Sequence, residues 1–388
     1  MDQELKSTTR ALITKVAIEG SLPVTTPLFQ CSAFQTGSSH FYTRKSNPNS
    51  EEFENVVKTL EDTAFAISVT TGMSAISLTL DLLEPGDTLV INQDIYGCSF
   101  KYFQRLALRR HLKLVILDLS QKENLVKIPD NTSMILFETP TNPFLKTISI
   151  SDVSIQVKKK NPKALVVVDN TWATPLFQSP TKWGADLSLH SATKYFSGHS
   201  DVMGGVILTD RADLHDQLKQ DRFFVGCILA PHSAWLLCRS LQTLPLRMRE
   251  HERVTKDMVR YLKDFSEIQK IYYPEIDGAQ LKSYGGIIFF QFRDALKNKY
   301  PEFIRNLKLF KTGTGMAAVT SMVAQPFTGS HASMNSEEKY AIGLDEGLVR
   351  LCFGFEDPDD LKADLSQAFK AVSESEKLSK QNSVQIQL

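Results

Sequence analysis

One lysine stands among small hydroxyl residues in the run Ser191-Ala192-Thr193-Lys194-Tyr195, and an apolar run ending in Asp169 precedes it. A lysine amine can form an imine with an aldehyde cofactor, and neighbouring hydroxyl groups can bind a phosphate group on the same cofactor. A lone lysine is more often a solvated surface charge. The residues around Lys194 favour the catalytic interpretation.

Two further segments could bind such a cofactor. Thr70-Thr71-Gly72-Met73-Ser74 follows an apolar run and opens a helical pattern, so its backbone N–H groups could hold a phosphate. A plain N-cap turn is the alternative. Tyr96 follows another apolar run and could stack on a planar ring, although a core tyrosine would look the same.

Polar residues also follow two later apolar runs. Glu138-Thr139-Pro140-Thr141-Asn142-Pro143 is a polar turn stiffened by prolines, and Asp169-Asn170-Thr171 ends the run before the lysine. An acid beside a pyridine nitrogen would keep the ring protonated and make it an electron sink. Judged alone, Asp169 could equally cap a turn.

These segments require a sheet that brings strand ends together. Six short runs predict strands, at 65–69, 88–91, 114–117, 134–137, 165–168 and 206–208. Short continuous apolar strands separated by helical patterns are typical of a mostly parallel sheet covered by helices. In such sheets, ligands bind beyond the C-terminal ends of the strands.

The flanking regions differ in character. Residues 1–50 form a polar, turn-rich arm, which is either disordered or wrapped around a neighbouring subunit. We expect a large domain over 51–235 and a smaller α+β domain over 236–388, joined by one long helix over 233–262. Residues 374–388 are polar, so we expect a frayed end.

The composition excludes several classes of function. Lys plus Arg and Asp plus Glu both number 44, so no net charge recruits nucleic acid or an anionic membrane. The five cysteines are dispersed without CxxC pairs, which indicates reduced thiols and no structural metal site. No apolar run is long enough to cross a bilayer, and the start lacks the form of a signal peptide. A cytoplasmic enzyme is the expectation.

The order and type of these segments resemble the pyridoxal-phosphate enzymes of cysteine and methionine metabolism, the trans-sulfuration group that includes cystathionine γ-synthase, cystathionine γ-lyase and methionine γ-lyase. The resemblance runs from about Pro23 to about Phe369, and its most specific motif is ADLSLHSATKYFSGHSDVMGG, residues 185–205. It implies the aspartate-aminotransferase-like α/β fold, fold type I: a large, mostly parallel sheet domain and a smaller C-terminal α+β domain.

The resemblance also assigns roles to residues. It implies that Lys194 forms the internal aldimine and moves protons, that Asp169 pairs with the pyridine nitrogen, and that Tyr96 stacks on the ring and could accept a proton from the incoming amine. The remaining cofactor contacts that it implies within the subunit are Gly72, Met73, Ser191, Thr193, Thr171 and Asn142.

A further motif implies an oligomer. The segment 41–48 resembles the family's Tyr-x-Arg…Asn-Pro motif, in which Tyr42 and Arg44 would reach the phosphate in the neighbouring subunit. Each site would then need two chains. The resemblance implies a dimer of active sites and favours a homotetramer.

Substrate contacts follow the same resemblance. Arg350 is the expected clamp for the substrate α-carboxylate, with Ser321 and Asn142 as helpers, and Lys101 and Cys98 would face the distal end of the substrate. A solvated Lys101 and an inert Cys98 are the alternatives. Thr320 stands where relatives commonly carry an acid, and Ser233 replaces a usual Asp, for which we find no functional account.

The expected reaction is β/γ-elimination or γ-replacement on a small amino acid that bears a sulfur or an activated oxygen substituent. The sequence leaves lyase and synthase open, and with them a specialised biosynthetic enzyme that uses an unusual nucleophile. An aminotransferase and a catalytically silent relative are the remaining alternatives.

Overall fold

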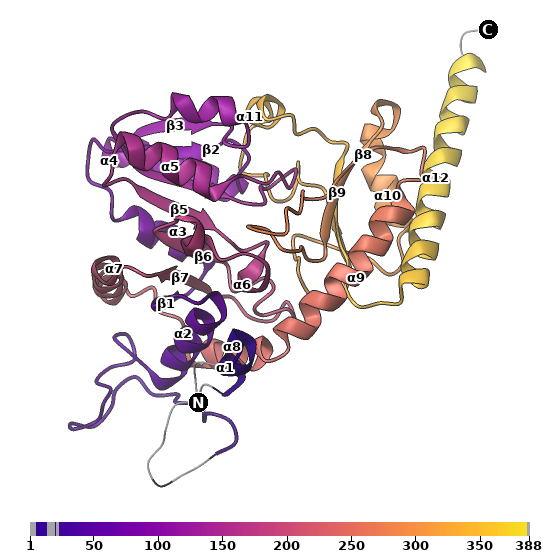
Figure 1. Cartoon of the computed structure of the whole chain (residues 1–388). Helices are drawn as coiled ribbons and strands as arrows, with labels where there is room; N and C mark the ends of the chain where they lie inside the picture. Colours follow the sequence, from indigo (N-terminus) through magenta and orange to yellow (C-terminus); the bar gives the residue numbers. More distant parts are fainter. Residues whose placement is uncertain (1–4, 14–19, 21–22, 386–388) are drawn as a thin grey trace.

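The computed structural model describes residues 5–13, 20 and 23–385. Its larger sheet has seven strands in the order β1-β7-β6-β5-β4-β2-β3 (Figure 1). The strands are β1 (Phe65–Val69), β2 (Thr88–Asn92), β3 (Lys113–Leu117), β4 (Thr132–Glu138), β5 (Leu165–Asp169), β6 (Leu187–His190) and β7 (Gly205–Thr209). Strands β3, β2, β4, β5 and β6 pair in parallel, whereas β7 is antiparallel to both β6 and β1.

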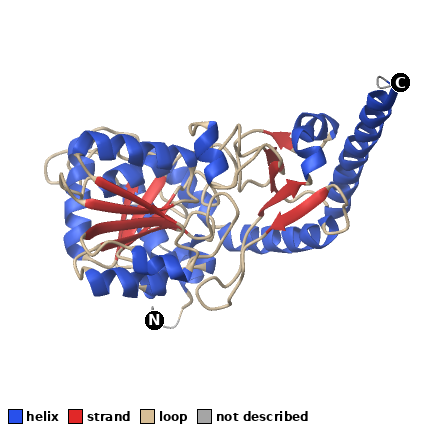
Figure 2. Cartoon of the chain, turned by 90° about the horizontal axis from the view of Figure 1, so that it is seen from above, coloured by secondary structure: helices blue, strands red, loops and turns tan. Residues whose placement is uncertain are grey.

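Helices lie on both sides of this sheet (Figure 2). They are α2 (Pro48–Glu61), α3 (Gly72–Leu80), α4 (Gly97–Arg110), α5 (Ile150–Lys160), α6 (Thr174–Phe177), α7 (Ala212–Val225) and α8 (Pro231–Leu241), with the 3-10 turns η1 (Lys122–Lys127) and η2 (Pro180–Trp183). Because both faces are covered, the central strands are apolar on both sides: Val166, Val167 and Val168 are all fully buried.

The smaller sheet has five strands in the order β10-β11-β12-β9-β8. Its elements are α9 (Leu244–Leu262), β8 (Ile268–Tyr272), β9 (Ile287–Phe292), η3 (Asp294–Lys299), α10 (Tyr300–Asn306), β10 (Lys311–Thr312), β11 (Met322–Ala324), α11 (Ser336–Ala341), β12 (Leu348–Cys352) and α12 (Pro358–Gln385). Helix α9 runs from beneath the larger sheet to the smaller one (Figure 1).

The six predicted strands are confirmed as β1–β5 and β7, and β6 is an additional strand. The single long helix predicted over 233–262 is wrong. It is two helices, because Pro245 lies in the first turn of α9 and lacks the backbone N–H that a continuous helix would need there. The frayed end predicted from residue 374 stays a prediction; over the described residues this segment belongs to α12, which continues to Gln385.

Within its described residues, the part of the arm before α2 contains one helix, α1 (Ser7–Ile13), which packs on α2. The part of the arm before α2 is tied to this chain's own body: Asn49 Oδ1 accepts from Phe29 N at 2.8 Å, and its Nδ2 donates to Pro27 O at 2.9 Å. Residues 34–41 then project from the body between the bridged pair Ala33 and Tyr42 (Figure 1). The predicted arm is thus partly anchored and partly projecting.

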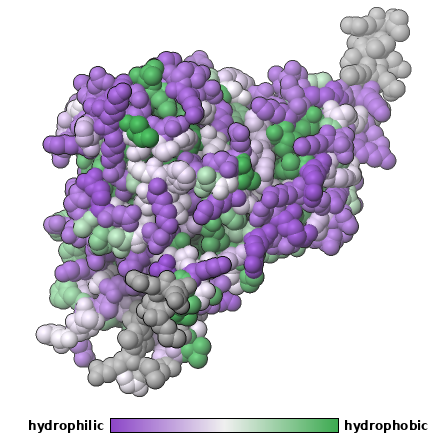
Figure 3. Space-filling view, in the orientation of Figure 1, coloured by the Kyte–Doolittle hydropathy of each residue, from purple (hydrophilic) through white to green (hydrophobic). Residues whose placement is uncertain are grey.

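Hydrophilic side chains cover most of the face seen in Figure 3, with apolar groups in separate patches. Among the described helices, none combines the length and apolarity that a bilayer span requires.

Two buried histidines predict a pH-dependent stability. His251 in α9 is fully buried with Nδ1 2.9 Å from Phe353 O, and burial lowers its pKa from 6.5 to about 4. Burial likewise lowers the pKa of His331 to about 4. Between about pH 6.5 and 4 the unfolded chain therefore binds more protons than the folded one, so stability falls as the pH falls, by up to about 1.4 kcal/mol per pH unit for each histidine.

We expect His251→Gln to reduce the loss of Tm between pH 7.5 and 5.0, measured by calorimetry at one scan rate. His232→Gln, at an exposed position, is the matched control and should leave the loss unchanged. An equal loss of Tm in His251→Gln and wild type would contradict this assignment.

Candidate active site

A cavity of about 380 Å³ lies at the C-terminal ends of the parallel strands of the larger sheet. Parallel strands end at the same edge of a sheet, so residues distant in sequence meet there. The lining residues are Thr71, Gly72, Met73, Ile76, Tyr96, Ser99, Glu138, Asn142, Asp169, Thr171, Trp172, Ser191, Thr193, Lys194, Met203 and Met316. Nine predicted site residues are thereby brought together within one chain.

One end of the cavity is suited to a phosphate group. Thr71 caps α3, its hydroxyl accepting from Ser74 N at 3.0 Å, and the N–H groups of Gly72 and Met73 lie in the first turn. A Cβ on Gly72 would lie 2.7 Å from Ser191 Cβ. Only glycine therefore lets the helix terminus approach Ser191 this closely.

The strand ends that carry the hydroxyl groups are linked to one another. Ser191 N donates to Thr171 Oγ1 at 2.8 Å, which joins the ends of β6 and β5. Thr193 Oγ1 accepts from Gly204 N at 3.2 Å and donates to Gly204 O at 3.3 Å. The predicted phosphate contacts are thus held by the backbone of neighbouring segments.

Lys194 lies in the loop after β6 and lines the cavity. Burial lowers the pKa of its amine, the positive charge of Arg350 lowers it further, and Cys352 and Asp169 act in the opposite direction. A lowered pKa increases the fraction of neutral amine, which is the form that attacks an aldehyde.

Asp169 ends β5 and faces the same cavity. Burial raises the pKa of its carboxyl group, while hydrogen bonds from Thr171 and the charges of His190 and Lys194 lower it; Thr171 N donates to Oδ1 at 3.0 Å. A cationic ring nitrogen placed beside Asp169 would add to the interactions that favour the ionised form.

Tyr96 is the residue before α4, and its backbone N–H donates to Glu138 Oε1 at 2.9 Å. Burial raises the pKa of its phenol to about 12. In this subunit Tyr96 is therefore a neutral phenol at pH 7, suited to stacking. That protonation state does not support the predicted role as proton acceptor.

Several lining residues were given no role from the sequence, among them Glu138, Ser99, Trp172, Met203 and Met316. Glu138 belongs to the polar turn noted above, so its position at a strand end was a usable signal. Trp172 directly follows Thr171, so its position in the sequence could equally have indicated a place in the site. Met316 comes from the smaller domain, and no local pattern could have placed it in this cavity.

Arg350 lies on β12 and is only 2% exposed. Its Nη2 donates to the carbonyl oxygens of Gly315 at 2.9 Å and Thr314 at 3.2 Å, and its Nε has no hydrogen-bond partner among the described residues. The guanidinium is close enough to Lys194 to lower its pKa, but it is not among the cavity-lining residues. In this structure backbone carbonyls hold the predicted carboxylate clamp.

The prediction that Ser321 helps to bind the substrate is not supported. Ser321 is fully buried, its hydroxyl donates to Glu356 Oε2 at 2.7 Å, and it accepts from Gly354 N at 2.9 Å. These bonds fix it inside the smaller domain beside β11. The loop that contacts Arg350 is instead 313–316.

Lys101 and Cys98 also lie outside the cavity lining. The Lys101 ammonium is 2.5 Å from Glu338 Oε1 of α11 and bonds to Gln104, so this chain provides its partners. Cys98 is exposed in the first turn of α4. The distal-substrate roles predicted for both residues therefore have no support within one subunit.

Tyr42 and Arg44 do not reach this cavity either. Arg44 donates to Phe223 O at 2.8 Å, and its guanidinium lies 4.4 Å from the Phe223 ring centroid. Within their own chain they line a separate surface depression with Pro231 and Ile228.

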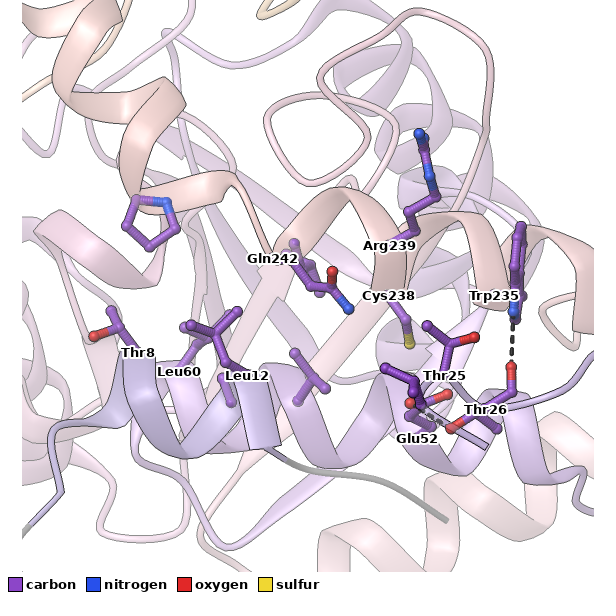
Figure 4. A pocket seen from close by; sticks show the side chains of 15 residues that line it. Thr8, Leu12, Thr25, Thr26, Glu52, Leu60, Trp235, Cys238, Arg239 and Gln242 are labelled. Atoms are coloured by element: carbon purple, nitrogen blue, oxygen red, sulfur yellow. Dashed lines mark hydrogen bonds between the residues drawn. The ribbon is translucent and has the colours of Figure 1, made fainter. Parts of the chain in front are cut away.

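A second cavity, of about 340 Å³, lies between α1, α2 and α8 (Figure 4). Trp235 Nε1 donates to Thr26 O at 2.9 Å, and the Thr26 hydroxyl donates to Glu52 at 2.7 Å. The contacts anchor the arm to the body. Among the described residues, the lining of this second cavity contains no lysine.

The first cavity fits pyridoxal phosphate. The close approach of Gly72 to Ser191 would form a cradle for the phosphate, Asp169 would provide an anion for the ring nitrogen, and Lys194 would provide the amine for the aldehyde. The buried Asn142 Oδ1 has no hydrogen-bond partner among the described residues and is available to a ligand. The described residues hold no group of three or more potential metal ligands.

Comparison with known proteins agrees with this geometry. Residues 9–370 match the family described as Cys/Met metabolism PLP-dependent enzyme. The chain is 34% identical over 356 residues to a cystathionine γ-lyase of Dictyostelium discoideum (89% of this chain, 91% of that protein) and 32% identical over 371 residues to an L-methionine γ-lyase of Fusobacterium nucleatum subsp. polymorphum (89% and 93%).

Among solved structures, a cystathionine γ-synthase of Xanthomonas oryzae pv. oryzae in complex with aminoacrylate and cysteine is similar with a TM-score of 0.91 and 33% identity, covering 95% of this chain and 99% of that one. The fold type I architecture and the pyridoxal-phosphate dependence predicted from the sequence are therefore confirmed. The chain belongs to the Cys/Met metabolism family of PLP-dependent enzymes, which carry out carbon–sulfur chemistry on small amino acids.

Proposed function

We propose that this enzyme catalyses β/γ-elimination or γ-replacement on an amino acid bearing a sulfur or an activated oxygen substituent. The observation that carries the proposal is the presence, in one cavity, of an amine with a lowered pKa at Lys194, the carboxylate of Asp169 and the α3 terminus. When bound, pyridoxal phosphate supplies an electron sink that makes the protons of the attached amino acid removable.

Asp169 stabilises positive charge on the ring nitrogen, and its own geometry is fixed by Thr171. Tyr96 provides an aromatic face whose position is set by the bond between its N–H and Glu138. Together they orient the ring at the end of the sheet.

Lys194 is the proton carrier. Its amine has a lowered pKa and sits beside the charges of Arg350 and Asp169. A base of this kind accepts and returns protons near neutral pH more readily than an exposed lysine. The flexible side chain lets a single amine serve more than one carbon of the substrate.

Arg350 binds the substrate α-carboxylate. The unpartnered Nε gives one donor, and a carboxylate could replace the carbonyls of Thr314 and Gly315 at Nη2. Binding would therefore free the 313–316 loop from Arg350, and Met316 is the residue of that loop that reaches the cavity.

The reaction is tested with a substrate panel. The purified enzyme, loaded with cofactor, is incubated with cystathionine, methionine, cysteine, and O-acyl- and O-phosphohomoserine, each with and without a thiol, and products are identified by mass spectrometry. A 2-oxo acid with ammonia identifies a lyase, and a thiol adduct identifies a synthase. Formation of pyridoxamine phosphate together with the 2-oxo acid that keeps the γ-substituent of the substrate, without ammonia or a thiol adduct, would refute the proposal in favour of an aminotransferase.

We further propose that each site is completed by Tyr42 and Arg44 of a second copy, in a homo-oligomer built from dimers, with a tetramer as the expected assembly. Supporting observations are the projecting segment 34–41 with Phe41 72% exposed, and further exposed apolar side chains at Met203, Phe224 and Val225. Met203 itself lines the cavity. An exposed apolar group at the rim of a site is suited to cover by a partner.

Subunit complementation tests this arrangement. Lys194→Ala and Arg44→Ala are each expected to be nearly inactive alone. Randomly paired subunits should regain about a quarter of wild-type activity, because half the dimers are hybrids and each hybrid has one intact site. Failure of the mixture to exceed the two separate variants would contradict a shared site.

We propose a cytoplasmic location because the cysteines form no disulfide bonds with one another in the structure. All five are free in the structure, and Cys238 and Cys352 are buried. Reduced, dispersed thiols are typical of a reducing compartment.

A further inference from the structure

Two carboxyl groups lie side by side in the active-site cavity. Glu138 ends β4 and Asp169 ends β5, and the two residues are direct partners in the parallel register. Neighbouring strands are about 4.8 Å apart and register partners point to the same face, so both side chains enter the same space. Two carboxylates at this spacing do not both ionise readily.

Their surroundings differ. Asp169 accepts a hydrogen bond from Thr171 N, and Thr171, His190 and Lys194 each act to lower its pKa. The backbone N–H groups of Tyr96 and Asn142 favour the ionised form of Glu138, but the charged groups that act on it from neighbouring elements are acidic: Asp169 on β5 and Asp94 after β2. The environment therefore ionises Asp169 first and leaves the proton on Glu138.

The second oxygen of Glu138 is unused by the protein. The residue is 3% exposed, and Oε2 has no hydrogen-bond partner among the described residues. A buried polar atom without a partner is costly, so its position on a ligand cavity indicates that a ligand completes it. A protonated carboxyl group at this position is a hydrogen-bond donor.

We propose that Glu138 is a cofactor-positioning residue whose carboxyl group remains protonated, holds the backbone of Tyr96 through Oε1, and donates from Oε2 to the bound cofactor. The inference rests on the proposed function only in placing the cofactor in this cavity. It explains how one anion, at Asp169, is preserved beside a second acid. Burial and the charge of Asp169 both raise the pKa of Glu138, in agreement with this assignment.

The test uses Glu138→Gln, Glu138→Leu and a control, Glu54→Gln. Glu54 is a carboxylate paired with Arg222 at 2.6 Å, away from the cavity. In infrared difference spectra of the cofactor-free proteins at pH 7.5, Glu138→Gln should remove a C=O stretch of a protonated carboxylic acid. Glu54→Gln should remove a carboxylate band instead. This readout does not depend on turnover or on the identity of the substrate.

Affinity for pyridoxal phosphate gives the second readout, by equilibrium dialysis. Glu138→Gln keeps a neutral donor and an acceptor for Tyr96 N, so its affinity and kcat/KM should stay within about fivefold of wild type. Glu138→Leu should lose about 10- to 100-fold in affinity. Loss of a carboxylate band in Glu138→Gln, or unchanged affinity in Glu138→Leu, would overturn the proposal. If Glu138→Gln removes the C=O stretch as expected but the wild-type enzyme forms no product from any tested substrate, the result would count against the proposed function alone.

Discussion

Lys194→Ala should reduce turnover of the best substrate by about 10⁴-fold, because the variant loses both the amine that joins the cofactor and the base that moves substrate protons. The proposed phosphate contacts at Gly72, Ser191 and Thr193 are unchanged in this variant, so pyridoxal phosphate should still bind, without a covalent link. Turnover is measured by release of the 2-oxo acid or formation of the thiol adduct, and binding by absorbance after desalting.

Lys182→Ala is the matched control. Lys182 is a half-exposed lysine paired with Asp62 on the surface, and its loss should leave turnover unchanged. Ordinary turnover by Lys194→Ala would contradict the assigned role.

The second large effect is expected for Asp169→Asn, with a loss of about 10²- to 10³-fold in kcat. Asparagine keeps the size of the side chain and can still accept from Thr171 N, but it cannot balance a positive ring nitrogen. The bound cofactor should also change its absorbance, which reports on the ring independently of turnover.

Asp62→Asn serves as the control for a surface carboxylate, since Asp62 faces Lys182 and solvent. If Asp169→Asn kept both the wild-type kcat and the wild-type absorbance, the ring nitrogen would have to be held by another group.

Much of the larger sheet could be predicted because its strands are continuous apolar runs. β6 could not, since Leu187-Ser188-Leu189-His190 alternates with polar residues that are nonetheless buried. His190 Nε2 lies 2.6 Å from Glu61 Oε2, also buried, and that partner is 129 residues away in the sequence. A buried polar residue looks like a surface residue until its partner is located.

The residues of the candidate site also fall into those that the sequence could predict and those that it could not. Residues that line the cavity from strand ends, such as Lys194, Asp169 and Gly72, follow local patterns and were predicted. Lys101 and Ser321 were assigned by their position along the chain, but each is bonded to an acid in another segment, Glu338 and Glu356. Partners from the smaller domain are set by tertiary packing, which local sequence does not encode.

Borohydride reduction followed by peptide mapping shows whether Lys194 holds the cofactor covalently. The holoenzyme is reduced, digested and analysed by mass spectrometry for the added pyridoxyl phosphate group. We expect the modification on the peptide that contains Lys194 and on no other lysine. A modification at another lysine, or no modification in a protein that binds the cofactor, would contradict it.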